Sequence, residues 1–281
     1  MKTLQNKVVV VTGAGSGIGR ALAVSAASRG ASLALSDWNL EGVEETARLT
    51  GASAGRLLVR KVDVRSDDEV SRFADDVKAE MGGAHVVVNN AGVSLSDSIG
   101  TMKREDFAWV MDINFWGVVR GTEAFLPQLR AKDEAHVVNI SSVFGLIAVP
   151  RQSAYNASKF AVRGFTEALA QELAGTHVHV STVCPGGVRT GIVANGRHYH
   201  SSTGKPTDTA TVAAAFEKLA GTSSEKAAEI IWKGVSKNQA RILVGPDATF
   251  IQLMLRVFPE SYPKLVERGI ALSERLRGVS L

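Results

Sequence analysis

Short apolar runs alternate with longer amphipathic stretches along most of the chain. The runs are rich in Val, Leu and Ile and predict buried strands at Lys7–Thr12, Ser32–Ser36, Leu57–Lys61, His85–Asn89, His136–Ile140, Val178–Cys184 and Arg241–Val244. Between them, apolar residues recur at helical spacing over 17–29, 39–49, 67–81, 104–130, 153–174 and 224–237. Strands that are apolar throughout are covered on both faces. The pattern therefore predicts an α/β protein: a doubly wound, Rossmann-type parallel sheet of about seven strands with helices on both faces.

Two segments fall outside this pattern. Residues 186–208 are polar and rich in turn formers, which predicts a mobile loop, and we expect a substrate loop over about 186–222. Residues 1–246 would form one dinucleotide-binding and catalytic domain, and residues 247–281 a C-terminal helical extension. An apolar stripe runs along this extension through Phe250, Leu253, Met254, Val257 and Phe258. We expect the stripe to be buried, either against its own or a neighbouring subunit or as a lid over the site.

Composition excludes several classes of protein. The 281 residues carry a net charge of +4, but Lys and Arg alternate with Asp and Glu, so we expect no nucleic-acid partner. No apolar run approaches the ~18 residues of a membrane-spanning helix, and the N-terminus lacks the apolar stretch of a signal peptide. The single cysteine, Cys184, allows no internal disulfide, and two His-x-His pairs offer no obvious third metal ligand. We expect a cytoplasmic protein with no membrane span and no metal.

The first predicted strand ends in a glycine-rich segment, TGAGSGIG at residues 12–19, and a helical pattern follows it. Its spacing is Thr-Gly-x-x-x-Gly-x-Gly, because position 18 is Ile. Glycines let the backbone turn tightly and approach a pyrophosphate, whose charge then rests on the helix N-terminus. The segment therefore predicts a dinucleotide site formed by Gly13, Ser16, Gly17, Ile18 and Gly19.

Asp37 closes the second predicted strand, where the adenosine ribose of a dinucleotide lies. A carboxylate there accepts hydrogen bonds from both ribose hydroxyls and repels a 2′-phosphate, which favours NAD over NADP. A second role, capping the helix that starts near Asn39, is compatible with the first.

Reactive side chains follow later in the chain. Tyr155 and Lys159 are four residues apart in a predicted helix and share one of its faces. The strand before that helix ends in Asn-Ile-Ser-Ser at 139–142, and parallel sheets bind ligands at such strand ends. Asn114 lies inside the helical stretch 104–130, although asparagine is a poor helix former.

In combination these features make the sequence resemble the short-chain dehydrogenase/reductase family over about residues 5–245. The matches occur in family order at Thr12-Gly13-x-x-x-Gly17-x-Gly19, Asp63-Val64, Asn89-Asn90-Ala91-Gly92, Asn114, Ser142, Tyr155-x-x-x-Lys159 and Pro185-Gly186-x-Val188-x-Thr190. The resemblance implies a nicotinamide cofactor and a catalytic set of Asn114, Ser142, Tyr155 and Lys159. In this set Asn114 would hold a water that relays a proton from Lys159 to solvent.

The resemblance also implies further cofactor contacts. Lys159 would bind the nicotinamide ribose, Asp63 and Val64 would flank the adenine, and the remaining contacts would come from Asn90, Ala91, Gly92, Tyr155, Pro185, Val188 and Thr190. NADP users of the family place a base at the positions of Ser16 or Trp38, and neither is basic here. Arg20 is the nearby cation, and we expect it to face away.

The chemistry of alcohol oxidation explains the catalytic residue types. A base must take the hydroxyl proton while hydride leaves carbon, and a free tyrosine titrates near pH ~10. Lowering its pKa by about three units requires roughly 4 kcal/mol, which Lys159 and a positive nicotinamide ring would supply. Ser142 would hydrogen-bond the substrate oxygen.

Apolar residues near the predicted reaction centre indicate a hydrophobic secondary alcohol or ketone as substrate, with Leu95, Phe144 and Val149 as candidate contacts. The leading hypothesis is an NAD-dependent dehydrogenase. The alternatives are an NADP-dependent ketone reductase and a nucleotide-sensing protein that is not an enzyme. A homotetramer or homodimer is expected from aromatic residues on two long helices: Phe107, Trp109, Phe115, Trp116, Phe160 and Phe165.

Overall fold

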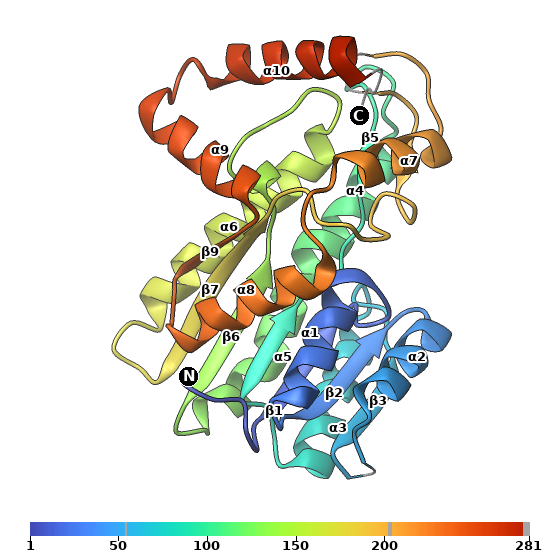
Figure 1. Cartoon of the computed structure of the whole chain (residues 1–281). Helices are drawn as coiled ribbons and strands as arrows, with labels where there is room; N and C mark the ends of the chain where they lie inside the picture. The colour runs from blue at the N-terminus through green and yellow to red at the C-terminus, as the bar shows by residue number, and fades with distance from the viewer. Residues whose placement is uncertain (54, 202–203, 278–281) are drawn as a thin grey trace.

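The computed structural model describes residues 1–53, 55–201 and 204–277, with side chains as far as Gly269. Within these residues a seven-stranded parallel sheet has the order β3-β2-β1-β4-β6-β7-β9 (Figure 1). Its strands are β1 (Val8–Thr12), β2 (Ser32–Asp37), β3 (Leu57–Lys61), β4 (Val86–Asn89), β6 (Ala135–Ile140), β7 (Val178–Pro185) and β9 (Arg241–Val244). Each lies within one residue of a predicted strand, so the predicted fold class is confirmed.

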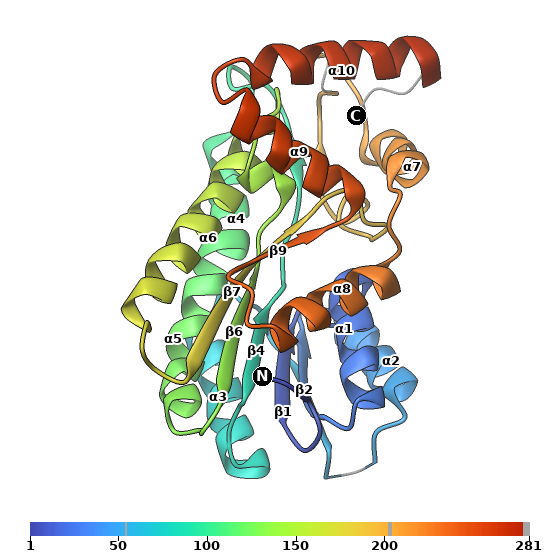
Figure 2. The same ribbon diagram turned by 60° about the vertical axis from the view of Figure 1, so that its left-hand side comes forward.

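Helices cover both faces of the sheet (Figure 2). On one face lie α1 (Gly17–Ser28), α2 (Leu40–Thr50) and α8 (Ser224–Ser236), and on the other lie α3 (Asp67–Met81), α5 (Gly117–Arg130) and α6 (Ser153–Glu172). The strand β1 shows why its first four residues are all apolar. Val9 and Val11 pack in the core of the first face, whereas Val8 and Val10 pack in the core of the second.

The predicted long helix over 104–130 is continuous but not regular. It consists of α4 (Arg104–Met111), the π-helical segment η1 (Asp112–Trp116) and α5. Asn114 sits in the π-helical segment and is fully buried. Such segments insert an extra residue into a helix and often occur at functional sites.

The remaining elements gather beyond the carboxyl ends of the strands. These are β5 (Leu95–Ser96), the 3₁₀ turn η2 (Val143–Gly145), β8 (Arg197–His198), α7 (Thr209–Leu219), α9 (Pro246–Val257) and α10 (Tyr262–Arg277) (Figure 1). The segment predicted as a mobile loop contains β8, which pairs in parallel with β5. Nowhere in the described residues does a helix combine the length and apolar character needed to cross a membrane.

Most of the apolar stripe of the C-terminal extension is exposed among the described residues, although Met254 is half-buried. Phe250, Leu253, Val257 and Phe258 are all exposed, and Phe250 keeps 66% of its surface. Packing of these four side chains within their own subunit is therefore not found among the described residues, and their burial against a neighbouring subunit stays a prediction. Helix α9 instead turns a different face toward the body of the protein, where Ala248 is fully buried.

Candidate active site

A cavity of about 770 Å³ lies at the carboxyl ends of the strands. Residues that follow β1, β2, β3, β4, β6 and β7 all contribute to its wall, as expected for a parallel sheet. The predicted cofactor residues in this wall are Gly13, Ser16, Gly17, Ile18, Asp37, Asp63, Val64, Asn90, Ala91, Gly92, Tyr155, Lys159, Pro185, Val188 and Thr190. Gly19 lies outside the wall.

The glycine loop needs its glycines for two different reasons. Gly13 and Gly17 adopt positive φ angles of 65° and 53°, which side chains disfavour. A Cβ atom on Gly19 would lie 2.2 Å from the carbonyl oxygen of Gly13, so this glycine allows the helix to begin directly under the loop. The carboxamide of Asn90 donates hydrogen bonds to the carbonyl oxygens of Thr12 and Gly13, at 3.0 and 2.9 Å. Asn90 therefore holds the loop from the neighbouring strand.

The N-terminus of α1 is available to an anion. Its N-cap residue, Ser16, makes no side-chain capping hydrogen bond, and no acidic residue lies in its first turn. Backbone N–H groups of an uncapped helix N-terminus bind phosphate oxygens, and the helix dipole favours negative charge there. The glycine loop and the helix together fit a pyrophosphate group.

Asp37 is held in place at the edge of the cavity. One carboxylate oxygen accepts a hydrogen bond from the backbone N–H of Gly15 at 2.8 Å, and the other accepts from that of Asn39 at 2.9 Å. The helix α2 is capped by Asn39 itself, whose side chain accepts from Gly42. Asp37 thus orients the loop and does not cap α2, which corrects the second predicted role.

Arg20 approaches the glycine loop from outside the cavity. Its guanidinium donates to the carbonyl oxygen of Gly15 at 2.5 Å and to that of Gly42 at 3.3 Å, and its Nε donates to Thr46 at 3.0 Å. Arg20 is absent from the described wall of the cavity. This cation therefore supports the loop and is not available to a phosphate on the ribose.

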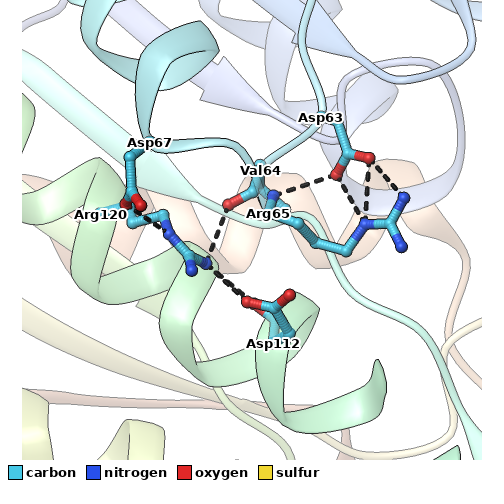
Figure 3. Close-up of polar contacts among 6 residues, drawn as sticks. All are labelled: Asp63, Val64, Arg65, Asp67, Asp112 and Arg120. Carbon is cyan, nitrogen blue, oxygen red and sulfur yellow. Dashed lines mark hydrogen bonds and ion pairs between the residues drawn. The ribbon is translucent and has the colours of Figure 1, made fainter. Parts of the chain in front are cut away.

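We call the part of the cavity next to Asp37 and Asp63 its adenosine end, after the roles predicted for these two residues. Two further residues there were not among the predicted cofactor contacts. Trp38 and Arg65 both line the cavity beside Asp37 and Asp63, and Trp38 keeps 71% of its surface exposed. Arg65 forms an ion pair with Asp63 (Figure 3). The hydrogen bond from Arg65 holds the pKa of Asp63 below its usual value. Arg65 could have been predicted as a residue of the cavity wall, because it lies two residues after Asp63, which was predicted to flank the adenine.

The predicted reacting side chains meet where β6 ends and α6 begins. Tyr155, Lys159 and Ser142 all line the cavity, and Ser142 hydrogen-bonds Tyr155. The Nζ atom of Lys159 donates to the carbonyl oxygen of Ile140 at 3.0 Å and lies 5.7 Å from the centre of the Tyr155 ring. The Oγ atom of Ser142 accepts from the backbone N–H of Phe144 at 3.1 Å.

Burial dominates the electrostatics of these side chains. It raises the pKa of Tyr155 to about 12, and the hydrogen bond with Ser142 opposes this rise. Burial also lowers the pKa of Lys159 to about 8. The sequence argument expected a lowered tyrosine pKa, so the chain alone shifts Tyr155 in the opposite direction. Both shifts favour the neutral forms of the two groups, as low-dielectric surroundings do.

Asn114 lies behind the cavity wall and not in it. Its Oδ1 accepts from the backbone N–H of Val93 at 2.8 Å, and its Nδ2 donates to the carbonyl oxygen of Val93 and to the hydroxyl of Ser158. Ser158 in turn donates to the carbonyl oxygen of Tyr155. The side chain of Asn114 thus connects the segment after β4 to α6, and this contact positions Tyr155 relative to Val93.

We call the part of the cavity around Phe144 its substrate end, after the contact predicted there, and the wall of this part is mainly apolar. The apolar side chains of this wall come from several helices and loops and are those of Val93, Trp109, Phe144, Ile192, Val193, Val212, Phe216, Leu219 and Ile251. Of the three candidate substrate contacts, Phe144 lines the cavity. Leu95 is fully buried against Val110 and Ala154, and Val149 lies outside the wall, so these two assignments are wrong. The C-terminal extension contributes Ile251 and Asp247 from α9.

The segment over the substrate end is held by polar contacts with the residues around β5. The buried ring of His198 contacts the hydroxyls of Ser94 and Ser96 at 3.1 and 2.9 Å. Arg197 forms an ion pair with Asp106 and stacks on Trp109, with the guanidinium carbon 4.0 Å from the ring centre. These contacts hold Arg197 and His198, which lie in the segment 186–208 that the sequence predicted as a mobile loop.

The parallel sheet and the residues that line the cavity at its carboxyl edge are together typical of oxidoreductases that bind a dinucleotide. The family model for short chain dehydrogenase matches residues 7–200. The chain is 45% identical to the Mycobacterium tuberculosis protein "Putative oxidoreductase SadH", over 96% of this chain and 98% of that protein. It is 31% identical to estradiol 17-beta-dehydrogenase 11 of Rattus norvegicus, over 96% of this chain and 85% of the relative.

A solved structure supports the same assignment. A short chain dehydrogenase/reductase of Burkholderia phymatum, crystallised with NAD, superposes with a TM-score of 0.82 at 30% identity, over 93% of this chain and 96% of that one. The protein belongs to the short-chain dehydrogenase/reductase family and is an oxidoreductase.

Proposed function

We propose that the protein is an NAD-dependent oxidoreductase that interconverts a hydrophobic secondary alcohol and its ketone. The observation that carries the proposal is the position of Tyr155, Ser142 and Lys159. These residues line one cavity together with the glycine loop and with the apolar wall formed by Phe144, Val212 and Phe216. A cofactor and an apolar substrate bound in that cavity would therefore meet at a tyrosine hydroxyl.

The residues present fit a nicotinamide dinucleotide. The glycine loop and the N-terminus of α1 would hold the pyrophosphate, and the oriented carboxylate of Asp37 would accept the ribose hydroxyls. A 2′-phosphate at Asp37 would meet a negative charge, which supports NAD over NADP. When bound, the nicotinamide would supply the acceptor or donor of hydride. One structural relative was crystallised with NAD, which supports the same choice.

The chain's own residues account for movement of the proton. Tyr155 would exchange a proton with the substrate oxygen at its hydroxyl, and Ser142 would hydrogen-bond the same oxygen and stabilise its developing charge. Because burial raises the pKa of Tyr155 to about 12, a positive charge near the ring is needed to favour the tyrosinate. Lys159, with a pKa lowered only to about 8, still carries its charge at pH 7.

The apolar wall supports a large hydrophobic substrate. The cavity, of about 770 Å³, lies within the range of about 300–1,000 Å³ that is typical of ligand pockets. Estradiol is itself a large apolar alcohol, and one relative is named for its dehydrogenation. We therefore favour a bulky secondary alcohol or ketone over a sugar.

We also propose a homodimer or homotetramer. Phe107, Trp116 and Phe160 are exposed on α4, η1 and α6, as expected for helices that contact another subunit. Sedimentation at micromolar concentration should give a species larger than 29.8 kDa. A monomer would contradict this part of the proposal.

A turnover screen tests the catalytic proposal. Purified protein is incubated with NAD or NADP and with secondary alcohols of graded hydrophobicity, and with the reduced cofactors and the matching ketones. We expect turnover with NAD that increases with the apolar size of the substrate and disappears in Tyr155→Phe. Higher efficiency with NADP, or turnover that survives in Tyr155→Phe, would contradict it.

A further inference from the structure

Arg65 is the cation of the cavity wall at its adenosine end. The other described cations that line the cavity are Lys159, at the reaction centre, and Arg197, which is paired with Asp106 over the substrate end. Arg65 lies in the loop after β3, next to the end of β2, because Asp37 and Lys61 are paired across these two parallel strands. Arg65 and Asp37 both line this cavity, and the carboxylates that act on Arg65 are those of Asp63 and Asp112.

Arg65 is closely bound to Asp63. Its Nε lies 3.0 Å from both carboxylate oxygens of Asp63, and one terminal nitrogen lies 2.6 Å from Oδ2 (Figure 3). The backbone N–H of Arg65 also donates to Oδ1, at 3.0 Å. The carboxylate thus accepts from the backbone and the side chain of the same residue. This arrangement directs the guanidinium toward its own loop.

We propose that Asp63 controls cofactor choice through Arg65, by holding the guanidinium in an ion pair and so withholding it from a 2′-phosphate. NADP would then be disfavoured twice: Asp37 repels the phosphate, and Asp63 occupies the cation that would otherwise bind it. The inference rests on the proposed binding of a nicotinamide dinucleotide. It assigns Arg65 no contact with NAD, which has no phosphate at this position.

The size of the effect follows from the exposure of the pair. Arg65 and Asp63 keep 46% and 33% of their side-chain surface, so water screens their attraction and the pair is weak. Contacts of a guanidinium with a phosphate are charge-assisted and stronger than contacts between neutral groups. Removing the charge of Asp63 should therefore release Arg65 to a 2′-phosphate and improve its binding by about three- to tenfold.

The chain contains a matched control for this experiment. Asp67, the first residue of α3, lies four residues after Asp63 and forms an ion pair with Arg120 of α5 (Figure 3). Asp67 lies outside the described wall of the cavity. Asp67→Asn therefore removes an equal charge nearby and leaves Asp63 as the ion-pair partner of Arg65.

Equilibrium binding tests the inference without any substrate. The dissociation constants of NADH and NADPH are measured for the full chain from nicotinamide fluorescence, in wild type, Asp63→Asn, Arg65→Gln, the double variant and Asp67→Asn. 2′,5′-ADP and 5′-ADP, measured by calorimetry, isolate the contribution of the 2′-phosphate. Asp63→Asn should strengthen binding of NADPH relative to NADH by about three- to tenfold. Asp67→Asn should leave the ratio within about twofold of wild type.

The double variant separates two explanations. If Asp63 acts through Arg65, Asp63→Asn should give no improvement in NADPH binding once Arg65 is Gln. An improvement that persists in the Arg65→Gln background, or an equal one in Asp67→Asn, would overturn the inference. Failure of the proposed function would look different, because wild-type protein would then bind neither NADH nor NADPH.

Discussion

Lys159 is a buried lysine, and we expect its burial to contribute measurably to the pH dependence of stability. Only 2% of its surface is exposed, and its ammonium group donates to the carbonyl oxygen of Ile140. Burial lowers its pKa from the ordinary value of 10.5 to about 8. We predict that Lys159→Met removes a part of the pH dependence of the free energy of unfolding that lies between pH 8 and 10.5.

The sign follows from where each state binds its proton. Between pH 8 and 10.5 the unfolded chain keeps the proton on Lys159 and the folded chain releases it. The unfolded state therefore binds more protons, so stability due to this group rises with pH in that window. From pH 7 to pH 10 the rise should be about 2–3 kcal/mol. Tyr155, whose pKa is raised, acts in the opposite direction above pH 10 in both proteins.

Urea unfolding of wild type and Lys159→Met at pH 7, 8, 9 and 10 measures the effect. The difference in free energy of unfolding between the two proteins cancels the other titrating groups. Wild type should gain about 2–3 kcal/mol relative to the variant as the pH rises from 7 to 10. The unpaired carbonyl of Ile140 costs the variant a similar amount at every pH, about 1–3 kcal/mol, and does not change the slope.

Two parallel curves would refute the reasoning, because they would show that the lysine titrates alike in the folded and unfolded chain. The expected curves have a functional meaning. At pH 7 the folded protein maintains a buried charge at the expense of stability, which is typical of a group retained for its chemistry.

Three further predictions concern the proposed reaction. Tyr155→Phe should lower turnover at least a hundredfold, because the phenol acts in proton transfer, and should leave the dissociation constant of NADH within about threefold of wild type. Steady-state rates measure the first effect and nicotinamide fluorescence the second. Asp37→Ala should narrow the preference for NAD over NADP by about five- to tenfold, because it removes the repulsion of a 2′-phosphate, and kcat/KM with each cofactor measures it. Truncation after Val244 should leave the protein folded and able to bind NADH but raise KM severalfold for bulky alcohols only, because α9 contributes Ile251 to the cavity wall; an equal loss on all substrates would favour a purely structural role.

The parts of the fold that follow from short-range patterns were predictable. The strands β1, β2, β4 and β6 have apolar side chains in both cores, so a run rich in Val, Leu and Ala marks each of them without reference to the rest of the chain. Tyr155 and Lys159 share a face because they are four residues apart in one helix. The glycine loop depends on residues that are adjacent in sequence.

Contacts between distant segments were not predictable in the same way. Leu95, in the two-residue strand β5, packs in the core, whereas Ser94, the residue before the strand, lines the cavity. So short a strand gives no repeat from which to assign the inward face. The contact of His198 with Ser96 joins positions far apart in the chain, and no local pattern in the segment 186–208 indicated it.

The electrostatics of Tyr155 and Lys159 could not be inferred from their residue types. A lysine beside a tyrosine was expected to lower the tyrosine pKa, but the same burial that would strengthen their attraction also penalises each charge separately. A tyrosinate and an ammonium therefore stabilise one another only if the attraction exceeds two desolvation terms. A positive ring bound beside both groups would favour the tyrosinate and disfavour the ammonium. Whether Tyr155 or Lys159 releases its proton would thus depend on the charge of the bound cofactor. Binding of the cofactor would then be coupled to release of a proton from these two side chains.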